Sequence, residues 1–213
     1  MGVGVLILLL FCVCCVVSSF GAGSYAYLYM GPAAEIDPTS EEILAALGPV
    51  PGVKAQTVKL VNAQGELVTD ADVITEPTLI YFGYTFCPDV CPLDTARNAE
   101  VVDLLAERGI STTPVFISID PERDTPEAVG DFAYNMHEKM IGLTGSVEQV
   151  KAASKAYRTY FKANKAEDDE YYLVDHSTFS YLVLPEYGFV EFFRREATAA
   201  QMADTVACFV NQT

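Results

Sequence analysis

Two cysteines in the middle of the sequence have the spacing and the surroundings of a reactive or metal-binding pair. Cys87 and Cys91 stand four residues apart and follow directly on the apolar run 79–82. Such a run predicts a buried strand, and the strand-to-helix junction after it is where α/β sheets expose functional groups. Residues i and i+4 share one face of a helical turn, and helix N-terminal amides favour thiolate over thiol. The two thiols are therefore expected to converge, and the plainer alternative is an inert or disulfide-bonded pair.

One histidine stands in a comparable position later in the chain. His176 lies between the strand-like runs 171–174 and 179–184, in a predicted loop at a strand end. The other histidine, His137, ends a predicted helix and is interpreted as solvent-exposed. A histidine such as His176 is, taken alone, more often structural. A thiolate pair that can reach the same site makes it a candidate third ligand.

Two thiolates and an imidazole favour a soft metal ion. Soft ligands select Cu(I), zinc or iron–sulfur clusters. Iron–sulfur clusters usually need four thiolates, and structural zinc wants four ligands. Cu(I) accepts fewer than four ligands, so we expect Cys87, Cys91 and His176 to bind copper as Cu(I). With added oxygen ligands, the same site could also hold Cu(II). Asp175 and Asp89 are candidate weak oxygen ligands, although Asp89 is more typical of a surface carboxylate.

Strands and helices alternate around these residues. The predicted strands are 58–61, 66–68, 78–83, 114–119, a short one closing at Leu143, 171–174, 179–184 and 189–193. The predicted helices are 41–47, 90–107, 126–137, 147–161 and 198–210, and a polar loop is expected at 162–170. This βαβ unit followed later by a hairpin and a helix is the thioredoxin order. The sequence therefore predicts an α/β, thioredoxin-like domain.

The helix predicted at 90–107 carries an apolar stripe that should face the sheet. The residues expected on that face are Val90, Leu93, Ala96, Val101, Leu104 and Leu105. The closing helix at 198–210 is expected to bury Met202, Val206 and Phe209, and to use Cys208 for packing.

The first 34 residues carry no charged side chain, and 3–17 is an unbroken apolar run. The segment 3–22 is long enough to span a bilayer, and the basic n-region of a signal peptide is missing. We expect an uncleaved N-terminal transmembrane helix at 1–30, a linker at 31–52 and the thioredoxin-like domain at 53–213. Three cysteines inside the span are expected to act as small apolar residues: Cys12, Cys14 and Cys15.

The overall charge and the single span limit the partners and the compartment. A formal net charge of -16 argues against nucleic acid, because phosphate binding needs a basic surface. A domain that handles copper and cycles its cysteines should face the periplasm or the mitochondrial intermembrane space. No Arg- and Ser-rich presequence is evident, which favours a bacterial inner membrane over the mitochondrial one. A monomer is the expected state.

Three motifs resemble one known family. Residues 83–92 read GYTFCPDVCP, residues 118–126 read SIDPERDTP, and residues 175–177 read DHS. In this order they resemble the Sco/SenC family of copper chaperones for cytochrome c oxidase, over about residues 55–212 and with an N-terminal anchor in addition. The resemblance implies copper binding by the two cysteines and the histidine. It also implies delivery of copper to the dinuclear CuA site of oxidase subunit II, or reduction of the cysteines of that site.

The second motif carries two aspartates with a plainer interpretation. From the residues alone, Asp120 ends a strand, and Asp124 with Thr125 caps a helix. The resemblance implies that both aspartates organise the region beside the copper site.

Two enzyme functions would use the same cysteines. A thiol–disulfide oxidoreductase needs one exposed thiol of low pKa and a resolving partner, which Cys87 and Cys91 could supply. The usual oxidoreductase motif has two residues between its cysteines, whereas three stand here, and exchange requires no imidazole. A peroxidase of the peroxiredoxin type requires a threonine three residues before the reactive cysteine. Tyr84 stands at that position before Cys87, and Pro88 before Cys91. The metallochaperone is the primary prediction, and the oxidoreductase is the alternative.

Overall fold

The computed structural model of the chain describes residues 58–165 and 171–211. The strands are β1 (Lys59–Asn62), β2 (Leu67–Thr69), β3 (Thr78–Gly83), β4 (Thr113–Ser118), β5 (Ile141–Thr144), β6 (Phe161–Ala163), β7 (Val174–His176), β8 (Ser180–Leu184) and β9 (Gly188–Phe193). The helices are α3 (Asp70–Val73), α4 (Val90–Glu107), α5 (Pro126–Met136), α6 (Val147–Tyr157) and α7 (Ala199–Val210).

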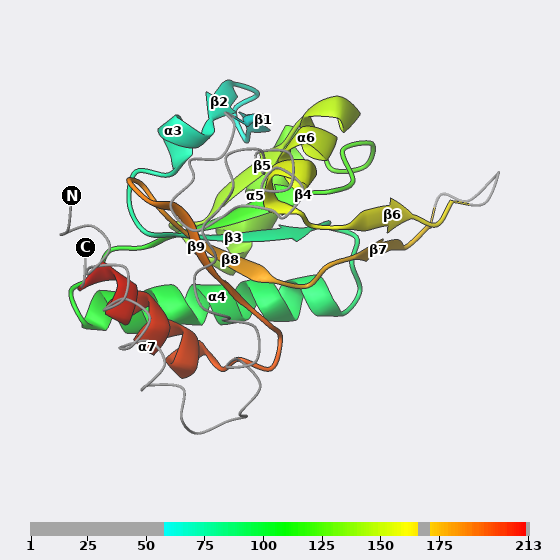
Figure 1. Cartoon of the computed structure of the whole chain (residues 1–213). Coiled ribbons are helices and arrows are strands. Elements are labelled where there is room, and N and C mark those ends of the chain that lie inside the picture. The colour runs from blue at the N-terminus through cyan, green and yellow to red at the C-terminus, as the bar shows by residue number, and fades with distance from the viewer. Residues whose placement is uncertain (1–57, 166–170, 212–213) are drawn as a thin grey trace, which may run out of the picture.

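Most strands in the described residues join one mixed sheet with helices on both faces (Figure 1). Its seven strands lie in the order β2-β1-β5-β4-β3-β8-β9. The strands β3, β4 and β5 are parallel, with β3 and β4 joined through α4, whereas β8 runs antiparallel to β3 and to β9. This βαβ unit followed by a hairpin and α7 is the predicted thioredoxin-like order. The remaining strands, β6 and β7, pair with each other as a separate two-stranded sheet.

The sheet separates two packing layers. On one face, α4 and α7 contribute to a buried cluster with members such as Leu79, Leu105 and Met202. The helix α5 lies on this same face, where its Phe132 packs against Phe116. On the other face, α6 covers residues such as Ile80 and Phe82, and the Phe82 ring packs against Tyr157 of α6. The neighbours Leu79 and Ile80 enter opposite layers because successive side chains of a strand point to opposite faces. With both faces covered, all six residues of β3 are buried, which explains the continuous apolar run 79–82.

The helix α4 covers the predicted residues, but the prediction of its buried face is partly wrong. Leu93 and Ala96, expected in the core, are exposed, Leu93 by 60%. The buried face instead carries polar residues: Asp94, Thr95 and Asn98. Tyr81 donates a hydrogen bond to Asp94, and Ser180 donates one to Asn98, so these polar groups are satisfied inside the protein. An apolar pattern cannot identify a face that polar residues occupy.

The region before His176 also differs from the prediction. The helix α6 ends at Tyr157, where Arg158 takes a left-handed conformation (φ 49°), and does not continue to residue 161. Strand β6 begins at Phe161 and extends into the predicted polar loop, while residues 171–173 form no strand. His176 is the last residue of β7, opposite Phe161. Two strands of three residues each are too short to leave an alternation that a sequence pattern could reveal.

Several predictions concern residues outside the described ranges. They are the transmembrane helix at 1–30, the linker at 31–52, and the short helix at 41–47. Among the helices that the structure describes, none has both the length and the apolar character needed to cross a membrane.

Candidate metal centre

The cysteine pair lies where β3 ends and α4 begins. Cys87 sits in the connecting turn, where its amide donates to the carbonyl of Tyr84 at 3.2 Å. Cys91 is the second residue of α4, and its amide donates to the Cys87 Sγ at 3.4 Å. The first amides of a helix have no partner within the helix, so a sulfur can accept one of them. The turn thus brings the two thiols to the same end of the helix, as the spacing predicted.

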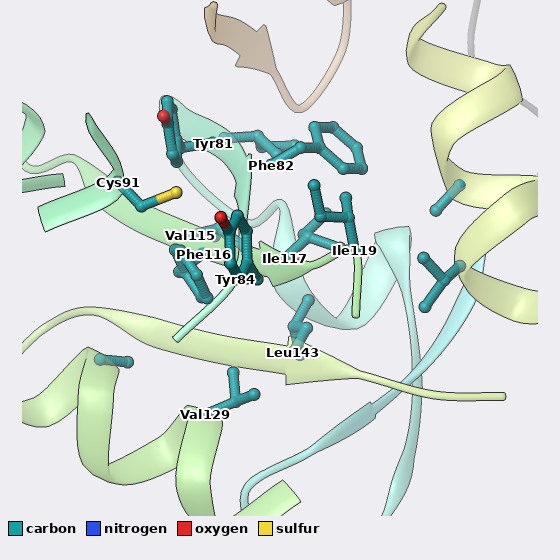
Figure 2. Close-up of a cluster of buried hydrophobic side chains, with 14 of the residues drawn as sticks. Tyr81, Phe82, Tyr84, Cys91, Val115, Phe116, Ile117, Ile119, Val129 and Leu143 are labelled. Atoms are coloured by element: carbon teal, nitrogen blue, oxygen red, sulfur yellow. The ribbon is translucent and has the colours of Figure 1, made fainter. Parts of the chain in front are cut away.

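Cys91 is enclosed by the apolar layer behind the site. Its exposed fraction is 0%, and its sulfur lies beside the rings of Tyr81 and Tyr84 (Figure 2). Gly83 leaves the space for it: a Cβ there would lie 3.0 Å from the Cys91 Sγ and 2.9 Å from the rings of Tyr81 and Phe116. The innermost sulfur therefore occupies a position fixed by close packing.

His176 reaches the cysteines from the other side of the site. Its Nδ1 lies 2.9 Å from the carbonyl oxygen of Ser177, which can only accept, so the proton is assigned to Nδ1. Its Nε2 then offers a lone pair, 3.4 Å from the Cys91 Sγ. The ring meets Tyr81 and Tyr84 edge-on, with centroids 6.2 and 5.9 Å away. A hydrogen bond to the second nitrogen that fixes tautomer and orientation is typical of histidines that bind metals.

The three side chains form a compact donor set. One ligand atom from each of Cys87, Cys91 and His176 can be chosen so that all lie within 4.8 Å of one another. Asp89 and Asp175, the candidate oxygen ligands, are exposed and stand outside this group. Two sulfurs and one nitrogen at this separation can hold a soft metal ion between them.

Burial and hydrogen bonding give the two thiols different acidities. Burial opposes ionisation of Cys87, but hydrogen bonds from the amides of residues 89–91 outweigh it and hold the pKa of that thiol below its usual range. Burial raises the pKa of Cys91 well above the usual range. Burial also lowers the pKa of His176, against the opposing effect of Ser177 and nearby carboxylates. At neutral pH the imidazole is therefore neutral, with its lone pair available.

These acidities predict which thiol reacts first. When the reduced, copper-free chain is treated with iodoacetamide, we expect Cys87 to be alkylated ahead of Cys91, because the thiolate is the nucleophile. The rate at Cys87 should rise with pH and reach half its maximum below the roughly 8.5 of an ordinary cysteine. Peptide mass spectrometry across a pH series measures both. Faster labelling of Cys91, or an ordinary midpoint at Cys87, would contradict this assignment.

Some supporting residues were not found from the sequence. Tyr81 donates to the buried Asp94 at 3.1 Å, and the Nε of Arg195 lies 3.3 Å from the other oxygen of that carboxylate. This chain of contacts fixes the tyrosine that packs against the histidine. The only available signal was the position of Asp94, three residues after Cys91 in one helix.

The interpretation of Asp124 as a helix cap is wrong. Thr125 caps α5 alone, with its side chain accepting from the amide of Ala128. Asp124 accepts instead from the amide and hydroxyl of Thr85, at 3.0 and 2.5 Å, and from the Ser118 hydroxyl at 2.6 Å. His137, interpreted as solvent-exposed, contacts Asp103 at 3.3 Å and is partly buried, away from the donor set.

Comparison with known proteins places the chain in a family. Residues 52–211 match the family model for SCO1/SenC. The chain belongs to the SCO1/SenC family. This confirms the resemblance drawn from the three motifs, and the α/β, thioredoxin-like fold is confirmed with it.

Relatives with known names span bacteria and eukaryotes. Protein SenC of Rhodobacter capsulatus is 55% identical over 152 residues, which are 71% of this chain and 68% of SenC. The mitochondrial SCO1 homolog of Homo sapiens is 40% identical over 152 residues, 70% of this chain and 50% of that protein. The chain therefore spans about half the length of its human relative. The crystal structure of Arabidopsis thaliana ScoI with copper bound is 38% identical, with a TM-score of 0.71, covering 76% of this chain and 100% of that one.

Proposed function

We propose that this chain is a copper-binding chaperone in the assembly of cytochrome c oxidase, and that it delivers copper to the CuA site of subunit II. The observation that carries the proposal is the convergence of Cys87, Cys91 and the Nε2 of His176 within 4.8 Å. Two further findings support it. A solved relative has copper bound, and Sco proteins are a family of cytochrome c oxidase assembly proteins.

The geometry suits a cargo that must be held and then released. The Cys91 sulfur lies in the apolar layer with an exposed fraction of 0%, whereas the imidazole of His176, edge-on to Tyr81 and Tyr84, is half-buried. Cys87 is nearer the surface, with 7% of its area exposed, and the thiolate form is favoured there. Three soft ligands leave copper able to accept another. An incoming thiolate from a partner can therefore enter beside Cys87, and copper can leave the fully buried Cys91 sulfur last.

Copper loading and transfer test this function directly. The full chain, reduced in detergent, is expected to bind one copper per chain and to pass it to the copper-free CuA domain of an oxidase subunit II. Oxidation should join Cys87 to Cys91 and abolish uptake of Cu(I). Metal analysis after gel filtration measures stoichiometry, and the absorption spectrum of the CuA domain measures transfer. Full Cu(I) uptake by the oxidised chain, or no uptake by the reduced one, would contradict the proposal.

A second candidate function is reduction of the CuA cysteines. It is favoured by the contrast between the acidic thiol of Cys87 and the buried thiol of Cys91. The Cys87 thiolate would attack the disulfide of the target and release one target thiolate. Cys91 would then give up its proton, displace the second target thiolate and close a disulfide with Cys87, so that two electrons pass to the target. A His176→Ala variant separates the functions, because copper binding should weaken while reduction of the disulfide continues.

The place of the protein in the cell is part of the same proposal. We place residues 1–30 in a bacterial inner membrane as one anchor, with the monomeric domain at 53–213 facing the periplasm. The 55% identity to a bacterial SenC supports this compartment over the alternative, the mitochondrial inner membrane with the domain in the intermembrane space. Such an anchor would keep the copper site close to an integral oxidase subunit.

A further inference from the structure

A single turn between β4 and α5 lies between the segment that carries the cysteines and the segment that carries the histidine. One carboxylate of the turn, that of Asp124, binds the loop that leads to Cys87. The Asp124 carboxylate accepts from both the amide and the hydroxyl of Thr85, two residues before Cys87. The carboxylate is buried, with 1% of the residue exposed, and the Ser118 hydroxyl supplies another hydrogen bond. This end of the turn is therefore firmly tied to the cysteine loop.

The other carboxylate of the turn, that of Asp120, binds the segment that leads to His176. Asp120, 4% exposed, accepts at one oxygen from the hydroxyl of Tyr172 at 2.6 Å. Its second oxygen accepts from the Nε of Arg123 at 2.5 Å. Tyr172 precedes His176 by four residues on the returning arm of the β6–β7 hairpin. The same turn thus reaches both ligand-bearing segments.

Arg123 bridges the two sides through aromatic rings. Its guanidinium carbon lies 3.6 Å from the ring centroid of Tyr172, on the histidine side. It lies 4.9 Å from the ring of Phe86 and 5.7 Å from that of Tyr84, both beside the cysteines. One guanidinium nitrogen, Nη2, is buried without a hydrogen-bond partner, so ring faces surround that end of the side chain. Cations attract aromatic faces most strongly when water is excluded.

The histidine depends on such contacts because its hairpin is not part of the main sheet. In the described residues, β6 and β7 pair only with each other, and the hairpin extends away from the body of the domain (Figure 1). The amide of Val174 donates to the Tyr84 hydroxyl at 3.4 Å, a long hydrogen bond between hairpin and cysteine loop. The buried Tyr172 and Val174, and an ion pair between Lys165 and Glu122, also attach the hairpin to the domain. Because Arg123 stacks on the same Tyr172 ring and holds the Asp120 carboxylate that this tyrosine binds, its loss should loosen that attachment.

We propose that Arg123 is a positioning residue for the metal centre, one that holds the β6–β7 hairpin against the cysteine loop. It contacts none of the three ligand atoms. Its effect on copper is exerted through His176, which reaches the sulfurs only while the hairpin is docked. This inference rests on the proposed function, because it assigns a role in the same copper site.

An Arg123→Gln variant tests the role in copper binding. Gln removes the charge and the planar stack, and Cu(I) affinity should fall about 10–100-fold, the usual effect of losing a partner outside the ligand set. In a His176→Ala background the same change should alter affinity less than about 2-fold, since residues acting through one contact are not additive. Arg123→Lys keeps the positive charge but not the planar guanidinium group, and it should recover part of the lost affinity.

A measurement without copper tests the docking itself. Amide hydrogen exchange of Val174 in the reduced, copper-free chain should be faster in Arg123→Gln, because the hairpin separates from Tyr84 more often. Amides of the central strand β3 should exchange as in the unsubstituted protein. Arg194→Gln is the matched control: this arginine also lies over two rings, Phe179 and Phe192, at 5.8 and 5.9 Å. It should change neither Val174 exchange nor copper affinity.

The results separate failure of this inference from failure of the proposed function. A reduced, unsubstituted chain that binds no copper refutes the function, while the exchange measurement still judges the docking role. An Arg123→Gln chain with unchanged affinity and unchanged Val174 exchange overturns the inference alone. So does a variant that weakens binding equally with and without His176, or one whose β3 amides also exchange faster. If Arg123→Gln does not fold, Arg123→Lys is measured in the same way. It should show a smaller loss of copper affinity and a smaller rise in Val174 exchange, and no change in either would overturn the inference.

Discussion

Replacing Cys91 with serine is expected to remove high-affinity copper binding. Serine keeps the size and the position of the side chain, but its hard oxygen is a poor ligand for Cu(I). Cys91 is also the central donor, 3.4 Å from the imidazole nitrogen of His176 and in contact with the Cys87 sulfur through its own amide. We expect Cu(I) affinity to fall by more than about 100-fold, beyond the range typical of partners outside the ligand set. Competition against a chromophoric Cu(I) chelator measures it.

Cys208→Ser is the control for this substitution. Cys208 lies in α7, partly buried and outside the donor set. Its replacement should leave copper affinity within about 2-fold of the starting value, since no ligand is lost. Equal losses in the two variants would mean that sulfur in general, and not the position at the start of α4, determines binding.

The second large effect concerns stability and uses two leucines of one helix. Leu105 in α4 is 0% exposed and belongs to the cluster shared with α7, whereas Leu93 is 60% exposed. Leu105→Ala should lower the free energy of unfolding by about 2–5 kcal/mol, through lost burial and the cavity left behind. Leu93→Ala should change it by less than about 0.5 kcal/mol. Urea denaturation followed by circular dichroism gives both values.

This pair tests the corrected face of α4, because the sequence pattern assigned both leucines to the core. Similar losses in the two variants would restore the apolar-stripe interpretation and contradict the structure. A small loss at Leu105 alone would show that the α4–α7 layer contributes less than its burial suggests.

The cysteine half of the site could be predicted from the sequence because its determinants are local. The strand 78–83 and the helix 90–107 have the predicted bounds, and the turn between them needs only the few residues around Cys87 and Cys91. A buried parallel strand has a continuous apolar run, and a long helix has a clear end signal in Gly109. The i, i+4 spacing then fixes the relation of the thiols without information from elsewhere in the chain.

The histidine half depends on contacts between residues far apart in sequence. His176 meets Cys91 across 85 positions, carried by two three-residue strands that left no readable pattern. The contacts of Arg123 and Asp120 with Tyr172 join two distant segments, and nothing in local propensity relates an arginine in one turn to a tyrosine about fifty residues later. The ligand chemistry of His176 beside a thiol pair, and the order of the motifs through family resemblance, indicated that these segments belong together.

Copper K-edge X-ray absorption of the reduced chain, loaded with one copper, shows whether Cys87, Cys91 and His176 hold one metal ion together. We expect two sulfur ligands and one imidazole nitrogen around copper, with the nitrogen signal lost in His176→Ala and one sulfur lost in Cys91→Ser. An unchanged spectrum in His176→Ala, or copper surrounded by oxygen and nitrogen without sulfur, would contradict this ligand set.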